Sequence, residues 1–220
     1  MTSALVLPRS RRSDGLEYDP DVACRHLTQA DLQLGDLIAQ VGEFAMRPRI
    51  THSLFVSLLR SIVYQQLSGK AAATILGRVV RLTAPQRFPT PRDFLQLPPE
   101  RLREAGLSAA KTAAVRDLAA RTLDGTVPPL ASIRRMEDEE IIQRLTLVRG
   151  IGRWTVEMLL IFRLGRPDVL PVDDLGVRKG FARVFRKGRI PEPATMLRRA
   201  EAWRPYRSVA TWYLYRALEL

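Results

Sequence analysis

Apolar side chains recur every three or four positions along most of this chain, which is the spacing of amphipathic α-helices. Residues 51–67 show it clearly, with Leu54, Leu58 and Ile62 on one face. The alternation typical of strands is weak throughout, and the β-branched run at 78–82 falls inside a helical pattern. The pattern predicts helices over residues 21–31, 32–42, 51–67, 68–83, 91–97, 99–105, 109–123, 137–147, 153–164, 175–185, 194–202 and 205–218.

The segments between these helices indicate how the chain is organised. Residues 1–19 are polar, basic and aperiodic, so we expect a mobile basic tail ahead of a helical domain at 20–220. The segment TVPPL interrupts the helical pattern, and we place a seam between two lobes near residues 125–130. The sequence therefore predicts an all-α fold of two helical lobes around a cleft, and such a cleft suits a substrate site.

The charge balance of the chain is strongly basic. Lys and Arg total 35 against 23 for Asp and Glu, which gives a formal net charge of +12. Such a surplus favours a polyanionic partner such as nucleic acid. An Arg-rich composition alone would also produce it, since only four of the basic residues are lysines.

Two absences in the sequence narrow the class of protein. Cys24 is the only cysteine, which excludes an internal disulfide and any four-cysteine zinc or iron–sulfur site. No apolar run reaches the roughly 20 residues of a membrane helix, and the first residues do not form a signal peptide. We therefore expect an intracellular protein without membrane contact.

The most informative segment is a short turn between two predicted helices, with the sequence LVRGIGRWTVEML. Gly150 and Gly152 permit positive φ angles and let another molecule approach the backbone closely. The helix that begins at Arg153 directs free N–H groups into this opening, where a DNA phosphate fits and Arg149 and Arg153 add charge. The alternative is a tight helix–helix connection in which the glycines serve only the turn.

A pair of carboxylates follows the hairpin by some twenty residues. Asp173 or Asp174 can cap the helix that begins at residue 175, and Asp174 could equally pair with Arg178. A carboxylate at a helix N-terminus also suits glycosidic chemistry, because it can stabilise a sugar oxocarbenium ion and orient water. The two histidines, His26 and His52, lie far back in the chain, so an enzyme here would depend on a carboxylate.

These two elements together, GIGRWT and then the second aspartate of PVDD, resemble the helix–hairpin–helix DNA glycosylase superfamily. Within it the chain is most similar to the bacterial inducible 3-methyladenine DNA glycosylases (DNA-3-methyladenine glycosylase II). The similarity spans about residues 50–218, through LRSIVYQQLSGKAA, GLSAAKTAAVRDLA, VRGIGRWTVEMLLIF, LPVDDLGVRKG and WRPYRSVATWYL.

The resemblance implies roles for individual residues near the reacting base. Asp174 matches the catalytic aspartate and Asp173 its non-catalytic neighbour. Trp154, Met158 and Tyr215 match positions of the substrate pocket. Met158 stands where the bacterial enzyme has tyrosine and Tyr215 where it has tryptophan, which puts the substrate range in doubt. Met158 and Tyr215 could also be ordinary core residues.

The resemblance further implies how DNA is held. Gln66 matches the residue that wedges into the gap left by the flipped base, although it could be an ordinary exposed helix residue. The backbone carbonyls of Thr146, Val148 and Ile151 match those that hold a Na⁺ or K⁺ ion beside a phosphate, and no other cofactor is required. The expected DNA contacts are Gln66, Arg149, Gly150, Ile151, Gly152 and Arg153.

The expected activity is that of a monofunctional DNA glycosylase, a hydrolase that flips alkylated purines such as 3-methyladenine out of double-stranded DNA and cleaves their N-glycosidic bond. We expect a monomer in the bacterial cytoplasm, associated with the nucleoid when bound to DNA. One alternative is a glycosylase–lyase for oxidised or mismatched bases, but such relatives carry a lysine where this chain has Trp154, and tryptophan forms no Schiff base. The other is a non-catalytic helix–hairpin–helix DNA-binding module.

Overall fold

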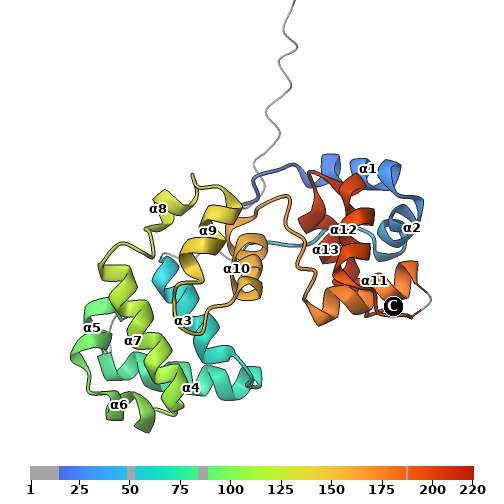
Figure 1. Ribbon diagram of the computed structural model, residues 1–220. Helices are drawn as coiled ribbons and strands as arrows, with labels where there is room; N and C mark the ends of the chain where they lie inside the picture. The colour runs from blue at the N-terminus through green and yellow to red at the C-terminus, as the bar shows by residue number, and fades with distance from the viewer. Residues whose placement is uncertain (1–14, 49–52, 84–88, 187) are drawn as a thin grey trace, which may run out of the picture. The chain divides into compact units, whose positions relative to one another are not determined.

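The computed structural model describes residues 15–48, 53–83, 89–186 and 188–220, and all regular structure within these ranges is helical (Figure 1). No helix in this part of the chain is long and apolar enough to cross a membrane. The elements are α1 (Pro20–Ala30), α2 (Leu32–Val41), α3 (Leu54–Tyr64), α4 (Gly69–Thr83), α5 (Pro91–Gln96), α6 (Pro99–Glu104), α7 (Ala109–Leu123), α8 (Leu130–Ile133), α9 (Asp138–Leu145), α10 (Arg153–Leu159), a π-helical turn (Leu160–Leu164), α11 (Leu175–Phe185), α12 (Pro193–Ala200), a 3₁₀ turn (Glu201–Trp203) and α13 (Arg207–Arg216).

The predicted all-α fold is confirmed, and each predicted helix has a counterpart. Caps explain several of the observed ends: the Ser108 side chain accepts the N–H of Lys111 at the start of α7, and Asp31 does the same for Leu34 in α2. The pattern did not predict α8, because one turn is too short to show a period. It also missed the π-helical turn that extends α10.

Contacts divide the chain into two compact units, which we call the terminal unit (Met1–Ile50 with Leu160–Leu220) and the central unit (Thr51–Leu159). The predicted seam near residues 125–130 differs from this division, because it lies inside the central unit. Val127 is buried there, and its N–H donates to the carbonyl of Arg121 at 2.8 Å. α7 already ends at Leu123, Pro129 is the N-cap of α8, and Val127 between the two helices remains in the core.

The start of the folded chain also differs from the predicted tail. Residues 1–14 lie outside the described residues, whereas residues 15–19 belong to the terminal unit. Leu16 is buried, the N–H of Glu17 donates to the carbonyl of Gly165 at 3.3 Å, and Asp19 caps α1. The predicted boundary at residue 19 is therefore too late, because a single buried leucine carries no periodicity.

The core of the central unit forms where α3 packs against α7. The apolar face predicted for α3 is buried, including Leu58 and Ile62, and α7 contributes Val115 and Leu118. This packing matters for the site because α3 ends at Tyr64, just before Gln66, and α7 packs alongside α3.

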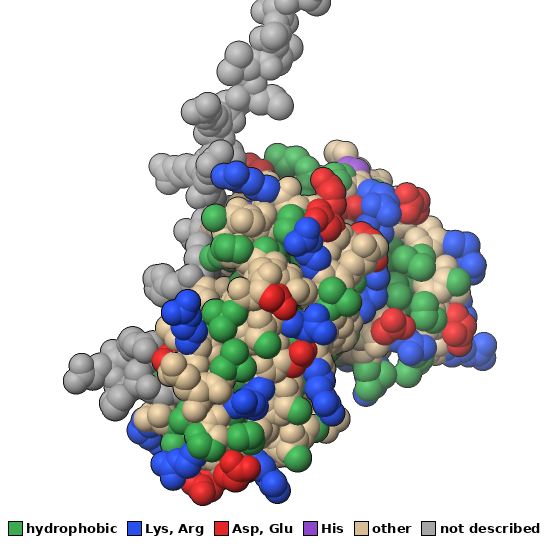
Figure 2. All heavy atoms as spheres, turned by 60° about the vertical axis from the view of Figure 1, so that its left-hand side comes forward, with side chains coloured by type: hydrophobic (Ala, Val, Ile, Leu, Met, Phe, Trp, Pro, Cys, Tyr) green, Lys and Arg blue, Asp and Glu red, His purple; other side chains and the backbone are tan. Residues whose placement is uncertain are grey.

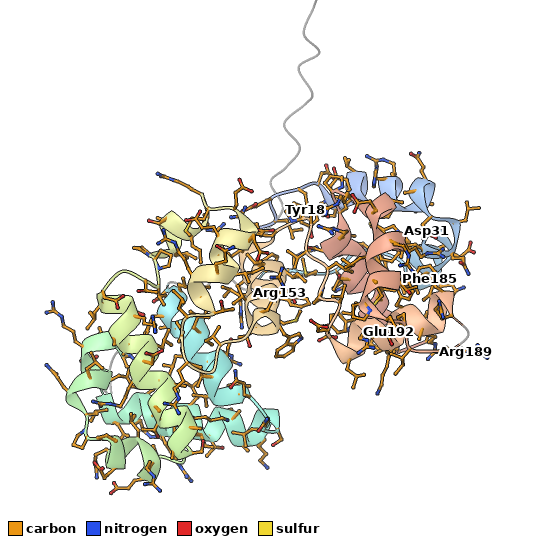
Figure 3. All side chains as sticks on the ribbon, in the orientation of Figure 1. Tyr18, Asp31, Arg153, Phe185, Arg189 and Glu192 are labelled. Carbon is orange, nitrogen blue, oxygen red and sulfur yellow. The ribbon has the colours of Figure 1, made fainter. Side chains whose placement is uncertain are left out.

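The core of the terminal unit forms where α11 packs against α13. The two helices approach so closely that a Cβ at Gly180 would overlap the backbone of Leu214. Trp203 is fully buried beside Phe181 and Phe185, and its indole N–H donates to Asp31 at 3.0 Å. Asp31 and Phe185 are labelled in Figure 3. This core fixes α11, which carries Asp174 at its N-terminus.

Candidate active site

Asp174 is the N-cap of α11. Its Oδ1 accepts the N–H of Val177 at 2.8 Å, and the residue is 8% exposed, whereas Asp173 is exposed. Of the two predicted capping residues, Asp174 is therefore the one that caps. The alternative ion pair with Arg178 does not form, since that guanidinium donates to the carbonyl of Pro191 at 3.0 and 3.3 Å.

The terminal unit brings Tyr215 close to Asp174. A Cβ built on Gly176 would lie 2.7 Å from Cε1 of Tyr215 and 3.1 Å from Oδ1 of Asp174, so both groups contact the same glycine. Tyr215 is half-buried on α13, with Phe162 stacked obliquely at a ring distance of 6.3 Å. Sequence reasoning missed Gly176, whose missing side chain leaves room for the aromatic ring against the first turn of α11.

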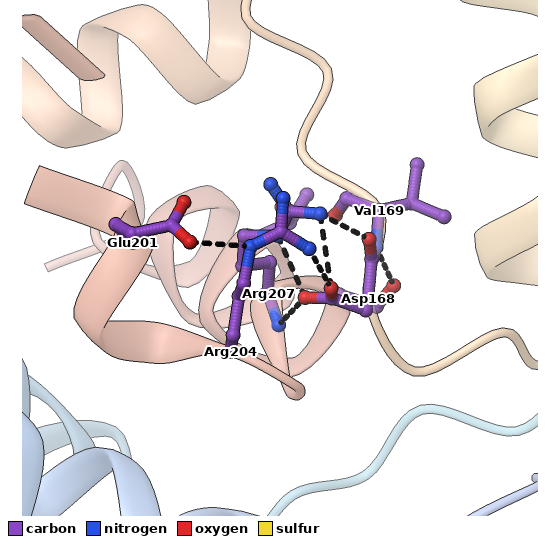
Figure 4. Close-up of polar contacts among 7 residues, drawn as sticks. Asp168, Val169, Glu201, Arg204 and Arg207 are labelled. Carbon is purple, nitrogen blue, oxygen red and sulfur yellow. Dashed lines mark hydrogen bonds and ion pairs between the residues drawn. The ribbon is translucent and has the colours of Figure 1, made fainter. Parts of the chain in front are cut away.

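The loop that leads to Asp174 is tied to the start of α13 by a cluster we call the Asp168 anchor, made of Asp168, Arg204 and Arg207 (Figure 4). The carboxylate of Asp168 accepts from Nε of Arg207 and from Nη1 of Arg204, each at 2.6 Å. Arg207 also donates to the carbonyl of Asp168 at 2.9 Å. Ser208 continues the anchor, because its Oγ accepts the N–H of Val169 at 3.0 Å. The approach of the chain to Asp174 is therefore fixed by charge-assisted hydrogen bonds.

The predicted hairpin is present in the central unit, between α9 and α10. Gly150 has a φ of +78°, in the left-handed region that favours glycine. Gly152 does not use the positive φ that a glycine permits, and a Cβ there would meet no atom within 4 Å. Among the described residues, neither glycine N–H donates a hydrogen bond. The turn thus presents two exposed glycines with open amides, and at Gly152 the backbone is also uncovered.

The two arginines of the hairpin differ in their surroundings. Arg149 is exposed, and its backbone N–H donates to Asp117 at 2.7 Å. Arg153 forms two hydrogen bonds with Glu139, at 2.8 and 3.1 Å, and one with Glu157 at 3.2 Å (Figure 3). The hydrogen bond with Glu139 raises the pKa of Arg153 above its ordinary value. Arg153 therefore joins α10 to α9. Other basic side chains are spread over the face of the molecule shown in Figure 2.

Two predicted pocket residues lie on α10. Trp154 is 47% exposed, an unusual position for a tryptophan outside a binding surface. Met158 follows one turn later and is half-buried. The exposed indole indicates a contact surface, since it is not part of a core.

Gln66 lies just beyond α3 and is exposed. The helix was predicted to continue to residue 67, but it ends at Tyr64. Gln66 has a φ of +55°, the only positive φ of a non-glycine residue in the described ranges. Such a conformation is uncommon for glutamine and marks strain that the surroundings maintain. Gln66 is therefore not an ordinary helix residue.

The predicted cation ligands are the carbonyls at the end of α9 and in the turn. The carbonyl of Val148 accepts the N–H of Ile151 at 3.0 Å, while those of Thr146 and Ile151 accept no hydrogen bond from a described residue. No group of acidic, histidine or cysteine side chains suited to a metal occurs in the described ranges. Carbonyls at a helix C-terminus fit a hard monovalent cation.

A helix–hairpin–helix turn and a later aspartate at a helix start, in an all-α fold, define a class of DNA repair protein. The chain belongs to the HhH-GPD superfamily of base excision DNA repair proteins, whose family model matches residues 59–205.

Within this superfamily, the chain is similar to several 3-methyladenine DNA glycosylases. DNA-3-methyladenine glycosylase 1 of Schizosaccharomyces pombe is 37% identical over 89% of this chain and 86% of the relative. A solved structure of a 3-methyladenine DNA glycosylase from the same organism, in complex with abasic DNA, superposes with a TM-score of 0.79 at 36% identity, covering 90% of this chain and 97% of that one. A DNA-3-methyladenine glycosidase from Bacillus halodurans gives a TM-score of 0.82 at 34% identity, covering 90% and 89%.

Proposed function

We propose that the protein is a monofunctional DNA glycosylase of the DNA-3-methyladenine glycosylase II type, which hydrolyses the N-glycosidic bond of alkylated purines in base excision repair. The observation that carries the proposal is the buried carboxylate of Asp174, held at a helix N-terminus beside Tyr215. The names of the similar glycosylases support the same substrate class.

The chemistry explains why so few groups are needed. Alkylation of a ring nitrogen makes the purine cationic and weakens its bond to the sugar, so the base leaves as a neutral molecule without a strong general acid. The carboxylate of Asp174 stabilises the oxocarbenium ion and orients the attacking water. The exposed indole of Trp154 offers a π-face to the cationic base.

The proposed partner is double-stranded DNA that carries an alkylated base. The open amides of Gly150 and Gly152 suit a phosphate of the DNA backbone, which positions the duplex without reading its sequence. The base is then flipped out of the stack, and Gln66 fills the gap. One protein molecule is sufficient, so we propose a monomer that acts on chromosomal DNA, at the nucleoid if the source is a bacterium.

A lyase activity is disfavoured because Trp154 stands where lyase members of the superfamily carry a lysine, and tryptophan forms no Schiff base. Of the four lysines, Lys70 and Lys179 are exposed and Lys187 lies outside the described residues. Burial lowers the pKa of Lys111, but its ammonium group donates to two backbone carbonyls at 2.7 and 2.8 Å. A cation close to the pocket would also repel an alkylated purine.

The test of this function is a base-release assay on duplex DNA treated with a methylating agent. We expect free 3-methyladenine and an intact strand that carries an abasic site. Borohydride should trap no covalent complex, because no imine forms. A trapped complex that disappears when one lysine is replaced would contradict the monofunctional assignment, and the absence of released base would contradict the enzyme itself.

We also propose that a Na⁺ or K⁺ ion occupies the carbonyls of Thr146, Val148 and Ile151 when DNA is bound. The carbonyls of Thr146 and Ile151 accept no hydrogen bond from the described part of the chain, which supports the assignment. At constant ionic strength, exchanging K⁺ for tetramethylammonium, which is too large for the turn, should weaken DNA binding about tenfold, or about 1.4 kcal/mol. Equal affinity in the two salts would contradict a specific cation.

A further inference from the structure

The turn that carries Gln66 is held from behind by α7. Lys111, on the first turn of α7, donates from Nζ to the carbonyl of Val63 at 2.8 Å and to that of Gln65 at 2.7 Å. These carbonyls end α3 and have no partner within the helix, so a cation stabilises them. Lys111 thereby fixes the backbone on one side of the strained residue Gln66.

The side chain of Gln65 extends from the same turn to the hairpin. Its Nε2 donates to the carbonyl of Gly150 at 2.9 Å, across 85 residues of sequence. Gly150 faces α7, since a Cβ there would lie 3.3 Å from Cβ of Ala114. One hydrogen bond therefore joins the turn of Gln66 to the backbone of the hairpin.

The hairpin is also held by α7. Asp117, one turn beyond Ala114, accepts the N–H of Arg149 at 2.7 Å and pairs with Arg121 at 3.0 Å. Lys111, Ala114 and Asp117 are spaced by three residues, so they share one face of the helix. This face supports both the Gln66 turn and the hairpin within the central unit.

We propose that Gln65 is a positioning residue, which with Lys111 and Asp117 fixes the Gln66 turn relative to the hairpin. In the proposed function, the hairpin holds the DNA backbone and Gln66 enters the gap left by the flipped base, and the inference rests on that function. The spacing between the two contacts determines whether Gln66 reaches the gap at the correct nucleotide. A displacement of about 1 Å at such a site can lower a rate about 100-fold.

The test is a double-mutant cycle on excision from methylated duplex DNA. Gln65→Met keeps the length of the side chain but removes the donor to Gly150. We expect Gln65→Met and Gln66→Ala each to lower single-turnover excision about tenfold. If Gln65 acts through the placement of Gln66, the double variant should lose no more than the Gln66→Ala variant, because neighbours that act as a unit are not additive.

Single-stranded methylated DNA distinguishes positioning from general damage to the fold. It has no gap to fill, so both single variants should keep excision within about twofold of wild type there. Lys111→Met should also act on the duplex alone, and Lys70→Met, which removes the same charge from an exposed site on α4, should change neither substrate.

The outcomes separate this inference from the proposed function. Additive losses in the double variant, equal losses on single strands, or no effect of Gln66→Ala on the duplex would overturn the positioning role while the glycosylase remains. No base release by the wild type would overturn the proposed function, and the positioning role with it.

Discussion

Asp174→Asn is expected to lower the rate of base release at least about 1000-fold, while the Kd for DNA stays within about threefold of wild type. Asparagine is a good N-cap, so the hydrogen bond to the N–H of Val177 and the start of α11 should be retained. The substitution removes the negative charge that, in the proposed function, stabilises the oxocarbenium ion. Single-turnover release of 3-methyladenine from duplex DNA, measured beside binding, checks the prediction.

Asp173→Asn is the matched control, because it removes the same charge one residue earlier, from an exposed side chain. We expect its rate within about threefold of wild type. Near-normal activity of the Asp174 variant would leave that residue as a helix cap and no more. A wild-type protein that binds damaged DNA but releases no base would instead indicate the non-catalytic DNA-binding module.

Gly152→Val is expected to weaken DNA binding about 30-fold, or about 2 kcal/mol, for all sequences alike. A Cβ at this position would meet no atom within 4 Å, and the backbone has no positive φ, so the fold should tolerate the substitution. The new side chain would instead occupy the space through which, in the proposed function, a phosphate approaches the hairpin amides. Binding isotherms at several salt concentrations, with the thermal midpoint of each variant, provide the measurement.

Gly150→Ala is the contrasting variant, because Gly150 has a φ of +78° and faces Ala114 at 3.3 Å. We expect it to reduce stability by about 1 kcal/mol, since the glycine serves the turn itself. If Gly152→Val bound DNA with unchanged affinity and an unchanged salt slope, the hairpin would not be part of the interface.

The helices were predicted well from the sequence because each buries one face, and the apolar residues of that face recur every three or four positions along the chain. The prediction failed where no repeat exists. The single turn of α8 and the π-helical turn after α10 are too short to show a period. The seam near residues 125–130 was inferred from two prolines. Prolines indicate where a helix cannot continue, but they do not show which elements share a core.

The local geometry of the candidate site was partly predictable, because part of it depends on residues that are close together in the sequence. The hairpin glycines and Asp174 lie in short local motifs, and their caps and turns depend on neighbours in sequence. Gln65 and Lys111 were not predicted, because their partners are 85 and 46 residues away and only the folded chain brings them together. Gly176 was missed because the ring of Tyr215 that it admits comes from another helix.

The Asp168 anchor has a consequence for the thermodynamics of DNA binding. Two guanidinium groups and Ser208 hold the loop before Asp174 through contacts that lie wholly within the terminal unit. Ordering a flexible loop upon association would oppose binding by roughly 1 kcal/mol or more for each immobilised residue. Because these contacts order the loop in the folded protein, the conformational entropy of the segment that carries the carboxylate is lost during folding and not during binding. The free energy of DNA association is then not reduced by ordering this loop, and more of it can offset the distortion of the duplex.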